Sequence, residues 1–210
     1  MSKQLLTIVF TLLMSLSALA QDTSWEDLTS KSNEFNDPFL SLTSDQLYNL
    51  SIVARYQARD SLSESEKTEY NDLLALLESE SIDVDYLLER RQDVTEHRKH
   101  LAMQPNIELK GKLIKIPGFV TPVEFDGDKV VKFFLVPTAG ACIHTPPPPP
   151  NQIVLVDYPQ GLTLTSLQDA FFIEGKLKIE AQKQKVNYSD GATMVNAVYM
   201  MSADKVTRYN

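Results

Sequence analysis

Apolar residues recur at helical spacing in three consecutive segments between residues 43 and 104. The first segment opens with Thr-x-x-Gln at residues 43–46, a capping box, and its apolar stripe predicts a helix of about fourteen residues. A second capping box, Ser-x-x-Glu at residues 63–66, precedes the next stripe, and Asp83 has the side chain expected of a helix N-cap before the third. Basic residues crowd the end of the third segment, where they complement the helix dipole. The pattern therefore predicts three helices.

After Pro105 the spacing of apolar residues changes from helical to alternating, which is typical of strands. Residues 130–136 are apolar on both faces, as in a central strand, and the segment 125–128 before them has the composition of a turn. Gly118 is at a position where a strand can bend sharply, and Gly175 interrupts the alternation of its segment. The predicted strands are residues 112–120, 130–136, 153–156, 171–180 and 195–203.

Five short strands in about a hundred residues favour a small closed barrel, because closure removes the exposed strand edges. We therefore expect an α+β protein in which a helical N-terminal region is followed by a small five-stranded antiparallel OB-like β-barrel. An open antiparallel sandwich is the main alternative. The expected organisation is a signal peptide at 1–20, an extended and loosely docked arm at 21–42, a helical region at 43–104 and the barrel domain at 105–210.

Residues 1–20 have the features of a secretory signal peptide: one early lysine, a short apolar stretch and Ala-Leu-Ala before Gln21. Cleavage after Ala20 would place the protein in the periplasm or outside the cell. Since the residue directly after that position is Gln21 and not a cysteine, we expect no lipid anchor, and no later stretch is apolar enough to span a membrane.

The chain is acidic, with a formal net charge of −8 at pH 7, and residues 1–20 contribute one lysine and no acid. Such a chain is a poor ligand for phosphate backbones, so we expect no nucleic-acid partner. Its glycines form no phosphate-binding pattern. The 43% hydrophobic residues are enough for one core of ordinary size.

Cys142 is the only cysteine and lies two residues before His144, one of three histidines. In an extended segment both side chains point to the same side, so both reach one metal ion, and thiolate with imidazole suits zinc or copper. His97 and His100 share one face of the third predicted helix. A Cys/His₃ zinc site would use all four residues, although the neighbouring Arg98 and Lys99 would repel a cation. A carboxylate can also replace either histidine.

Three other interpretations of Cys142 remain open. A buried structural cysteine is common. A Cys142–His144 nucleophile pair is disfavoured, because residues two apart in extended chain rarely meet at hydrogen-bond distance. Thiol–disulfide exchange lacks a second cysteine. We therefore assign no catalytic residue and expect the protein not to be an enzyme.

Five consecutive prolines at positions 146–150 follow this pair and predict an extended polyproline II rod of roughly 15 Å. Because predicted strands precede and follow the run, a rigid spacer across one end of the barrel is favoured over a docking peptide. Asn151 and Gln152, which follow the run, are expected to cap the rod or to hydrogen-bond its carbonyls.

Three blocks of the sequence together resemble a known family. They are Cys-Ile-His-Thr-Pro-Pro-Pro-Pro-Pro-Asn-Gln at 142–152, Leu-Ile-Lys-Ile-Pro-Gly-Phe-Val-Thr-Pro at 113–122 and Phe-Phe-Leu-Val-Pro at 133–137. The family that they resemble is the secreted bacterial family called domain of unknown function 3299. The similarity runs over residues 109–206, outside the predicted helices. It implies candidate ligands at Cys142 and His144, with the prolines as scaffold. Genes of the family often lie beside ABC-type transporters linked to zinc limitation, which implies an inner-membrane ABC transporter component as partner.

Two functional hypotheses follow. The first is a periplasmic metal-binding protein or transporter accessory factor, with zinc as the expected ion. The second is a non-catalytic protein-interaction module in which Cys142 is simply buried.

Overall fold

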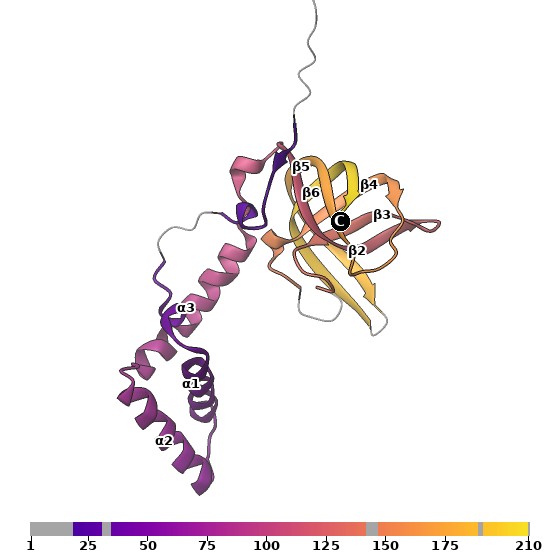
Figure 1. The fold of residues 1–210 in the computed structure, drawn as a ribbon. Helices are drawn as coiled ribbons and strands as arrows, with labels where there is room; N and C mark the ends of the chain where they lie inside the picture. The colour runs from indigo at the N-terminus through magenta and orange to yellow at the C-terminus, as the bar shows by residue number, and fades with distance from the viewer. Residues whose placement is uncertain (1–18, 31–34, 142–146, 189–190, 210) are drawn as a thin grey trace, which may run out of the picture.

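The structure is a computed structural model that describes residues 19–30, 35–141, 147–188 and 191–209. It is a mixed α+β fold with three α-helices and a six-stranded mixed sheet (Figure 1). Among the described residues, none of the helices combines the length and the apolar composition that crossing a membrane requires. The helices are α1 Ser44–Gln57, α2 Glu64–Ser79 and α3 Val84–Met103, and the short 3₁₀ turns are η1 Glu26–Leu28, η2 Pro38–Ser41, η3 Ile107–Leu109 and η4 Pro150–Gln152. The strands are β1 Gln21–Asp22, β2 Leu113–Asp126, β3 Lys129–Val136, β4 Val154–Leu162, β5 Ala170–Tyr188 and β6 Gly191–Arg208.

All three helices begin where their capping residues predict. The side chain of Thr43 accepts a hydrogen bond from the backbone N–H of Gln46, whose side chain accepts one from the backbone of Thr43. The same reciprocal pair joins Ser63 to Glu66 at the start of α2, and Asp83 caps α3. These bonds satisfy backbone donors that a helix N-terminus otherwise leaves unpaired, which is why local sequence was sufficient to place the helices.

The sheet differs from the prediction in its strand directions. Its order is β1-β2-β3-β4-β6-β5, and β2 also pairs with β5, so five strands pair in a cycle. Four pairs of the cycle are antiparallel, but β4 and β6 are parallel. The prediction of five antiparallel strands is therefore wrong. An odd number of strands that pair in a cycle cannot alternate in direction throughout, so at least one pair must be parallel.

A sixth strand and longer strand ends were not predicted. The two residues of β1 pair in parallel with Ile114 and Lys115 of β2. Strand β1 is too short to show the alternation of apolar and polar residues from which strands are predicted. Strands β5 and β6 remain paired to Tyr188 and Gly191, well beyond the predicted ends. Polar residues on this distal part of the hairpin hide the alternation on which the prediction depended.

The two strand glycines lie where backbones approach closely. A Cβ atom at Gly118 would be 2.9 Å from the Val136 carbonyl oxygen, and one at Gly175 would be 2.4 Å from the Ser202 carbonyl oxygen. Gly175 also lies at an irregularity in the β5–β6 pairing. Both glycines are thus explained by the close approach of a neighbouring strand, which the sequence did not predict.

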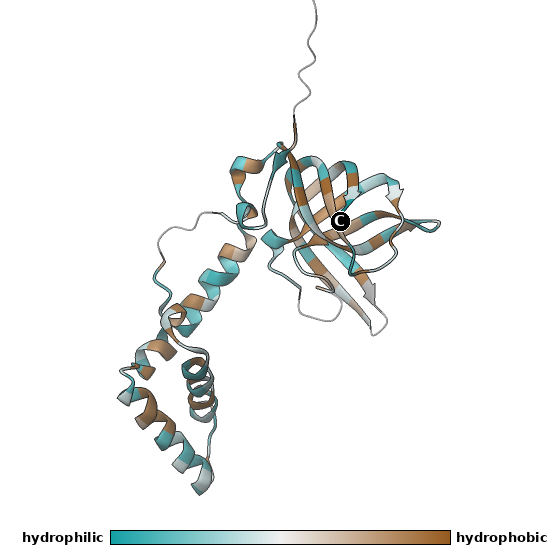
Figure 2. Ribbon diagram, in the orientation of Figure 1, coloured by the Kyte–Doolittle hydropathy of each residue, from teal (hydrophilic) through white to brown (hydrophobic). Residues whose placement is uncertain are grey.

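The hydrophobic core is divided between the sheet and the helices. Side chains alternate between half-buried and buried along the first half of β2. Figure 2 shows apolar residues (brown) interspersed with polar residues along the strands and the helices. A separate cluster of α1, α2 and α3 residues is centred on Val53 and Leu77, both fully buried. The helices α1 and α2 project away from the sheet, and the end of α3 approaches it (Figure 1).

The N-terminal arm is attached to the sheet more firmly than expected. The indole Nε1 of Trp25 donates to the Pro117 carbonyl oxygen at 2.8 Å, and Leu28 is fully buried in the sheet core. The fully buried Tyr199 hydroxyl donates to the Leu28 carbonyl oxygen and accepts from the backbone N–H of Asn106, each at 2.6 Å. This hydroxyl therefore joins the arm, the segment after α3 and strand β6.

We predict that Tyr199→Phe destabilises the protein by about 1–3 kcal/mol, because it leaves the buried Leu28 carbonyl without its best donor and weakens the pairing of Asn106. Urea unfolding followed by circular dichroism measures the change. The matched control is Tyr158→Phe, because the Tyr158 hydroxyl donates, among the described residues, to the exposed side chain of Gln160. Equal stability of the two variants would contradict the role given to the Tyr199 hydroxyl.

Candidate functional site

Cys142 and His144 lie outside the described residues, but the residues on either side of them are fixed. Ala141 is 3% exposed, and its backbone N–H donates to the Thr138 carbonyl oxygen at 3.2 Å. The carbonyl oxygen of Ala141 lies 3.4 Å from the Thr121 hydroxyl, which donates to it. The chain therefore enters residues 142–146 from a buried position against β2.

Asn151 fixes the other end of this segment. Its side chain is buried, and Nδ2 donates to the carbonyl oxygens of Leu101 at 2.9 Å and Gln104 at 3.2 Å. These carbonyls lie at the C-terminus of α3, where helix geometry leaves acceptors without intrahelical partners. Gln152 in turn donates from Nε2 to the Trp25 carbonyl oxygen at 2.8 Å. Both side chains thus hold α3 and the arm against the sheet and do not cap the proline rod. The predicted bond to a carbonyl of the rod is formed by the backbone N–H of Gln152, which donates to Pro149.

The proline run is a shorter rod than predicted. Pro149 has φ −53° and ψ 145°, close to polyproline II, but Pro150 already begins the turn η4. The Gln152 N–H closes that turn on the Pro149 carbonyl oxygen at 2.7 Å. Of the predicted rod, Pro146 lies outside the described residues and Pro150 is not part of it.

A shallow groove of about 360 Å³ lies beside the prolines. Sequence reasoning missed two of its contributors: Ala102 near the end of α3 and Met194 on β6, whose side chain is 46% exposed. No sequence signal marks either residue, because only the folding of α3 and β6 onto the proline run brings them together. The full lining is Ala102, Pro147, Pro148, Pro149, Pro150, Ile153, Met194 and Asn196.

The two helix histidines have separate surroundings. His97 stacks on Phe35 with ring centroids 3.7 Å apart, and its Nε2 atom is buried without a hydrogen-bond partner among the described residues. His100 is exposed, and its Nε2 lies 2.6 Å from Nε2 of Gln104. Within the described ranges no three His, Cys, Asp or Glu side chains form a group able to hold a metal ion. The meeting of these histidines with Cys142 and His144 stays a prediction.

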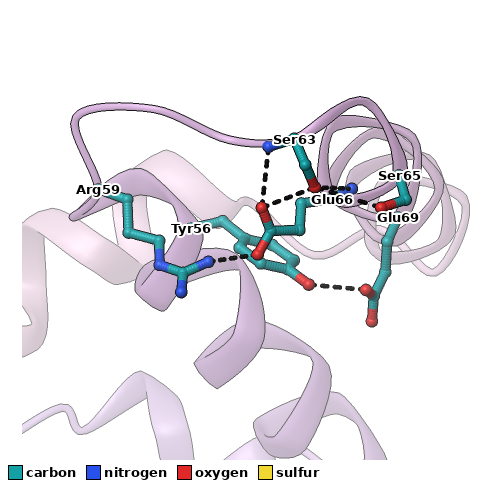
Figure 3. Close-up of polar contacts among 6 residues, drawn as sticks. All are labelled: Tyr56, Arg59, Ser63, Ser65, Glu66 and Glu69. Atoms are coloured by element: carbon teal, nitrogen blue, oxygen red, sulfur yellow. Dashed lines mark hydrogen bonds and ion pairs between the residues drawn. The ribbon is translucent and has the colours of Figure 1, made fainter.

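A second cluster of titratable groups lies between α1 and α2 (Figure 3). The Glu66 carboxylate accepts from the backbone N–H and hydroxyl of Ser63, both at 2.8 Å, and from Arg59 at 2.5 Å. These bonds, chiefly the one from the Ser63 backbone, lower the pKa of Glu66 from 4.5 to about 2. The Tyr56 hydroxyl donates to Glu69 at 2.6 Å, and this bond raises the Tyr56 pKa. The cluster is solvent-exposed and serves to cap α2, so we assign it no chemistry.

We predict that Glu66→Gln flattens the acid dependence of stability. The folded-state pKa lies below the ordinary value, so the carboxylate stabilises the fold above pH 4.5 and loses this effect as the pH falls towards about 2. As the pH falls from above 4.5 towards 2, the urea midpoint should decrease less for Glu66→Gln than for the parent protein. Glu89→Gln, on an exposed position of α3, is the control, and identical acid profiles for all three proteins would contradict the prediction.

No curated protein matches this chain. A solved structure of a DUF3299 family protein from Pseudomonas aeruginosa PAO1 has 25% sequence identity, covers 91% of this chain and 97% of its own, and has a TM-score of 0.49. The family model described as "Protein of unknown function (DUF3299)" matches residues 25–208. This confirms the predicted resemblance and extends it over the helices, which had been placed outside it. The chain belongs to the DUF3299 family.

Proposed function

We propose that this protein is a non-enzymatic periplasmic factor that binds zinc through Cys142 and His144 and serves an inner-membrane ABC transporter. The observation that carries the proposal is the attachment of Asn151 to the C-terminus of α3. It anchors the chain immediately after the prolines that follow the two ligands. A thiolate and an imidazole held in one short tethered segment form half of a tetrahedral zinc site.

The tether supports binding because it lowers the entropy lost when a metal orders its ligands. The described chain is buried at Ala141 before residues 142–146 and buried again at Asn151 after the prolines. One end is therefore fixed against β2 and the other to the end of α3, and prolines 147–149 restrict the chain further.

His97 and His100 are the proposed further ligands, with water, a carboxylate or a partner as alternatives. The Nε2 atom of His97 forms no hydrogen bond to a described residue, so binding zinc through this atom would break no such bond. The His97 ring would, however, have to move away from Phe35, on which it stacks. His100 is exposed and would exchange only its contact with Gln104. Both lie on the last turns of α3, the helix that Asn151 binds.

We further infer that the cycle of strand pairings is an OB-like barrel, a five-stranded Greek-key architecture. The cycle β2-β3-β4-β6-β5-β2 and its single parallel pair support this description. The proposed cleavage after Ala20 would make Gln21, the first residue of β1, the mature N-terminus. The transporter partner rests on the family resemblance alone.

A second candidate function is a protein-interaction module in which Cys142 is structural. The groove beside the prolines supports it, because Met194 is large, apolar and 46% exposed there. Methionine side chains are flexible and are common at surfaces that bind other proteins.

We predict that the protein purified under reducing conditions carries about one zinc ion per chain and that Cys142→Ser or His144→Gln removes it. Thr145→Ala is the matched control, since it alters the same segment without removing a proposed ligand. Metal analysis by mass spectrometry measures the content. Equally negligible zinc in the parent, control and variants would refute the proposal.

Thiol labelling separates the two candidate functions in the same preparations. A zinc-bound Cys142 becomes reactive when chelator is added, whereas a buried structural cysteine stays unreactive with or without chelator. A thiol that reacts rapidly without chelator would contradict both.

We predict that Asn151→Ala weakens zinc binding by about tenfold although both ligands remain. The variant loses the two hydrogen bonds to Leu101 and Gln104, so the segment that contains Cys142 and His144 is held less firmly before the metal binds. Competition with a chromophoric chelator measures the affinity. Thr145→Ala again serves as the control. Unchanged affinity in a folded Asn151→Ala protein would mean that the tether plays no part in binding.

A further inference from the structure

A groove of about 530 Å³ lies between α1 and α3, on the helical region that projects from the sheet. It exists because α1 packs mainly on α2 and makes only slight contact with α3. Its floor is apolar, with Leu50 and Val94 buried at 4% and 2% exposure and Phe39 half-buried. Leu47 on its wall is 40% exposed, so the groove is open to solvent.

The two walls of the groove follow helical spacing. On α1 the lining positions run from Leu47 to Ala58, and on α3 they run from Leu88 to Arg98. Each wall spans about three helical turns, or roughly 16 Å at 1.5 Å per residue. Small ligands are usually enclosed in a concave pocket, whereas a trough between two helices has the shape that a further helix fills with side chains at i, i+3, i+4 and i+7.

The rim of this groove is positively charged in a chain whose net charge is −8. Arg55, Arg91 and Arg98 all line it. Arg98 pairs with Asp37 at 2.6 Å, but Arg55 and Arg91 are exposed and form no ion pair with a described residue. Two guanidinium groups that have no ion-pair partner among the described residues lie beside an apolar floor, and this combination favours a partner with both apolar and acidic side chains.

We propose that the α1–α3 groove binds an acidic amphipathic helix of a partner protein. The apolar side chains of that helix would cover Phe39, Leu47 and Leu50, and its carboxylates would pair with Arg55 and Arg91. None of the described residues that line the groove is a proposed zinc ligand, so the interaction does not require bound metal.

The test uses the full chain and two fluorescent synthetic helical peptides with leucines at i, i+3, i+4 and i+7. One peptide has glutamates at the flanking positions, and the other has lysines there. Fluorescence anisotropy should show binding of the glutamate peptide only, weakening as salt is added. The double variant R55Q/R91Q should bind about tenfold more weakly, since each exposed pair contributes a few-fold.

Lys99→Gln is the matched control, because it removes one positive charge from α3 outside the groove and should leave binding unchanged. Ser51→Trp, at an exposed position on the α1 wall, should block the groove without removing charge. Circular dichroism verifies that each variant is folded.

Three outcomes would overturn the proposal. The first is equal binding of both peptides, or binding of neither. The second is binding by anionic phospholipid vesicles but not by the glutamate peptide, which would assign the groove to a membrane surface. The third is a dimer in sedimentation that Ser51→Trp dissociates, which would show that a second copy of the chain occupies the groove. Each is distinguishable from failure of zinc binding, since none of these measurements involves the metal.

Discussion

The buried hydroxyl of Tyr199 connects segments that are far apart in the sequence. It donates to the Leu28 carbonyl of the N-terminal arm and accepts from the Asn106 amide after α3, and Tyr199 itself belongs to β6. Burial raises the Tyr199 pKa above its ordinary value, while the bond from Asn106 acts in the opposite direction. A buried polar group without partners is costly, so the arm and the end of α3 must both be in place for the sheet core to close.

Asn151 and Gln152 extend the same junction to the proline run. Asn151 donates to the C-terminal carbonyls of α3, and Gln152 donates to the backbone of Trp25, whose indole binds β2. The junction therefore orients the base of the helical region and anchors the segment that follows Cys142 and His144. Of the two proposed binding sites, one depends on the segment that this junction anchors, and the other is the groove between α1 and α3.

Local patterns predicted the elements whose stability is local. The capping pairs Thr43–Gln46 and Ser63–Glu66 marked helix starts correctly, because each pair satisfies nearby backbone donors. The alternation in residues 112–120 and the run of residues 130–136, apolar on both faces, marked strands with buried positions. The predictions failed where a long-range contact decides the structure. Examples are the parallel pairing of β4 with β6, the firm docking of Trp25 and Leu28, and the true partners of Asn151.

The sequence by itself determined the three helices, five of the strands, the acidic charge and the position of the single cysteine two residues before a histidine, since these follow from spacing and composition. Only the tertiary structure decided which carbonyls Asn151 satisfies, which residues line the groove between α1 and α3, and where the arm attaches. The physical reason is that hydrogen bonds and apolar contacts between distant segments leave no periodic signal in the chain. The proline block thus carried the sequence signal, and its anchorage to α3 became visible only in the fold.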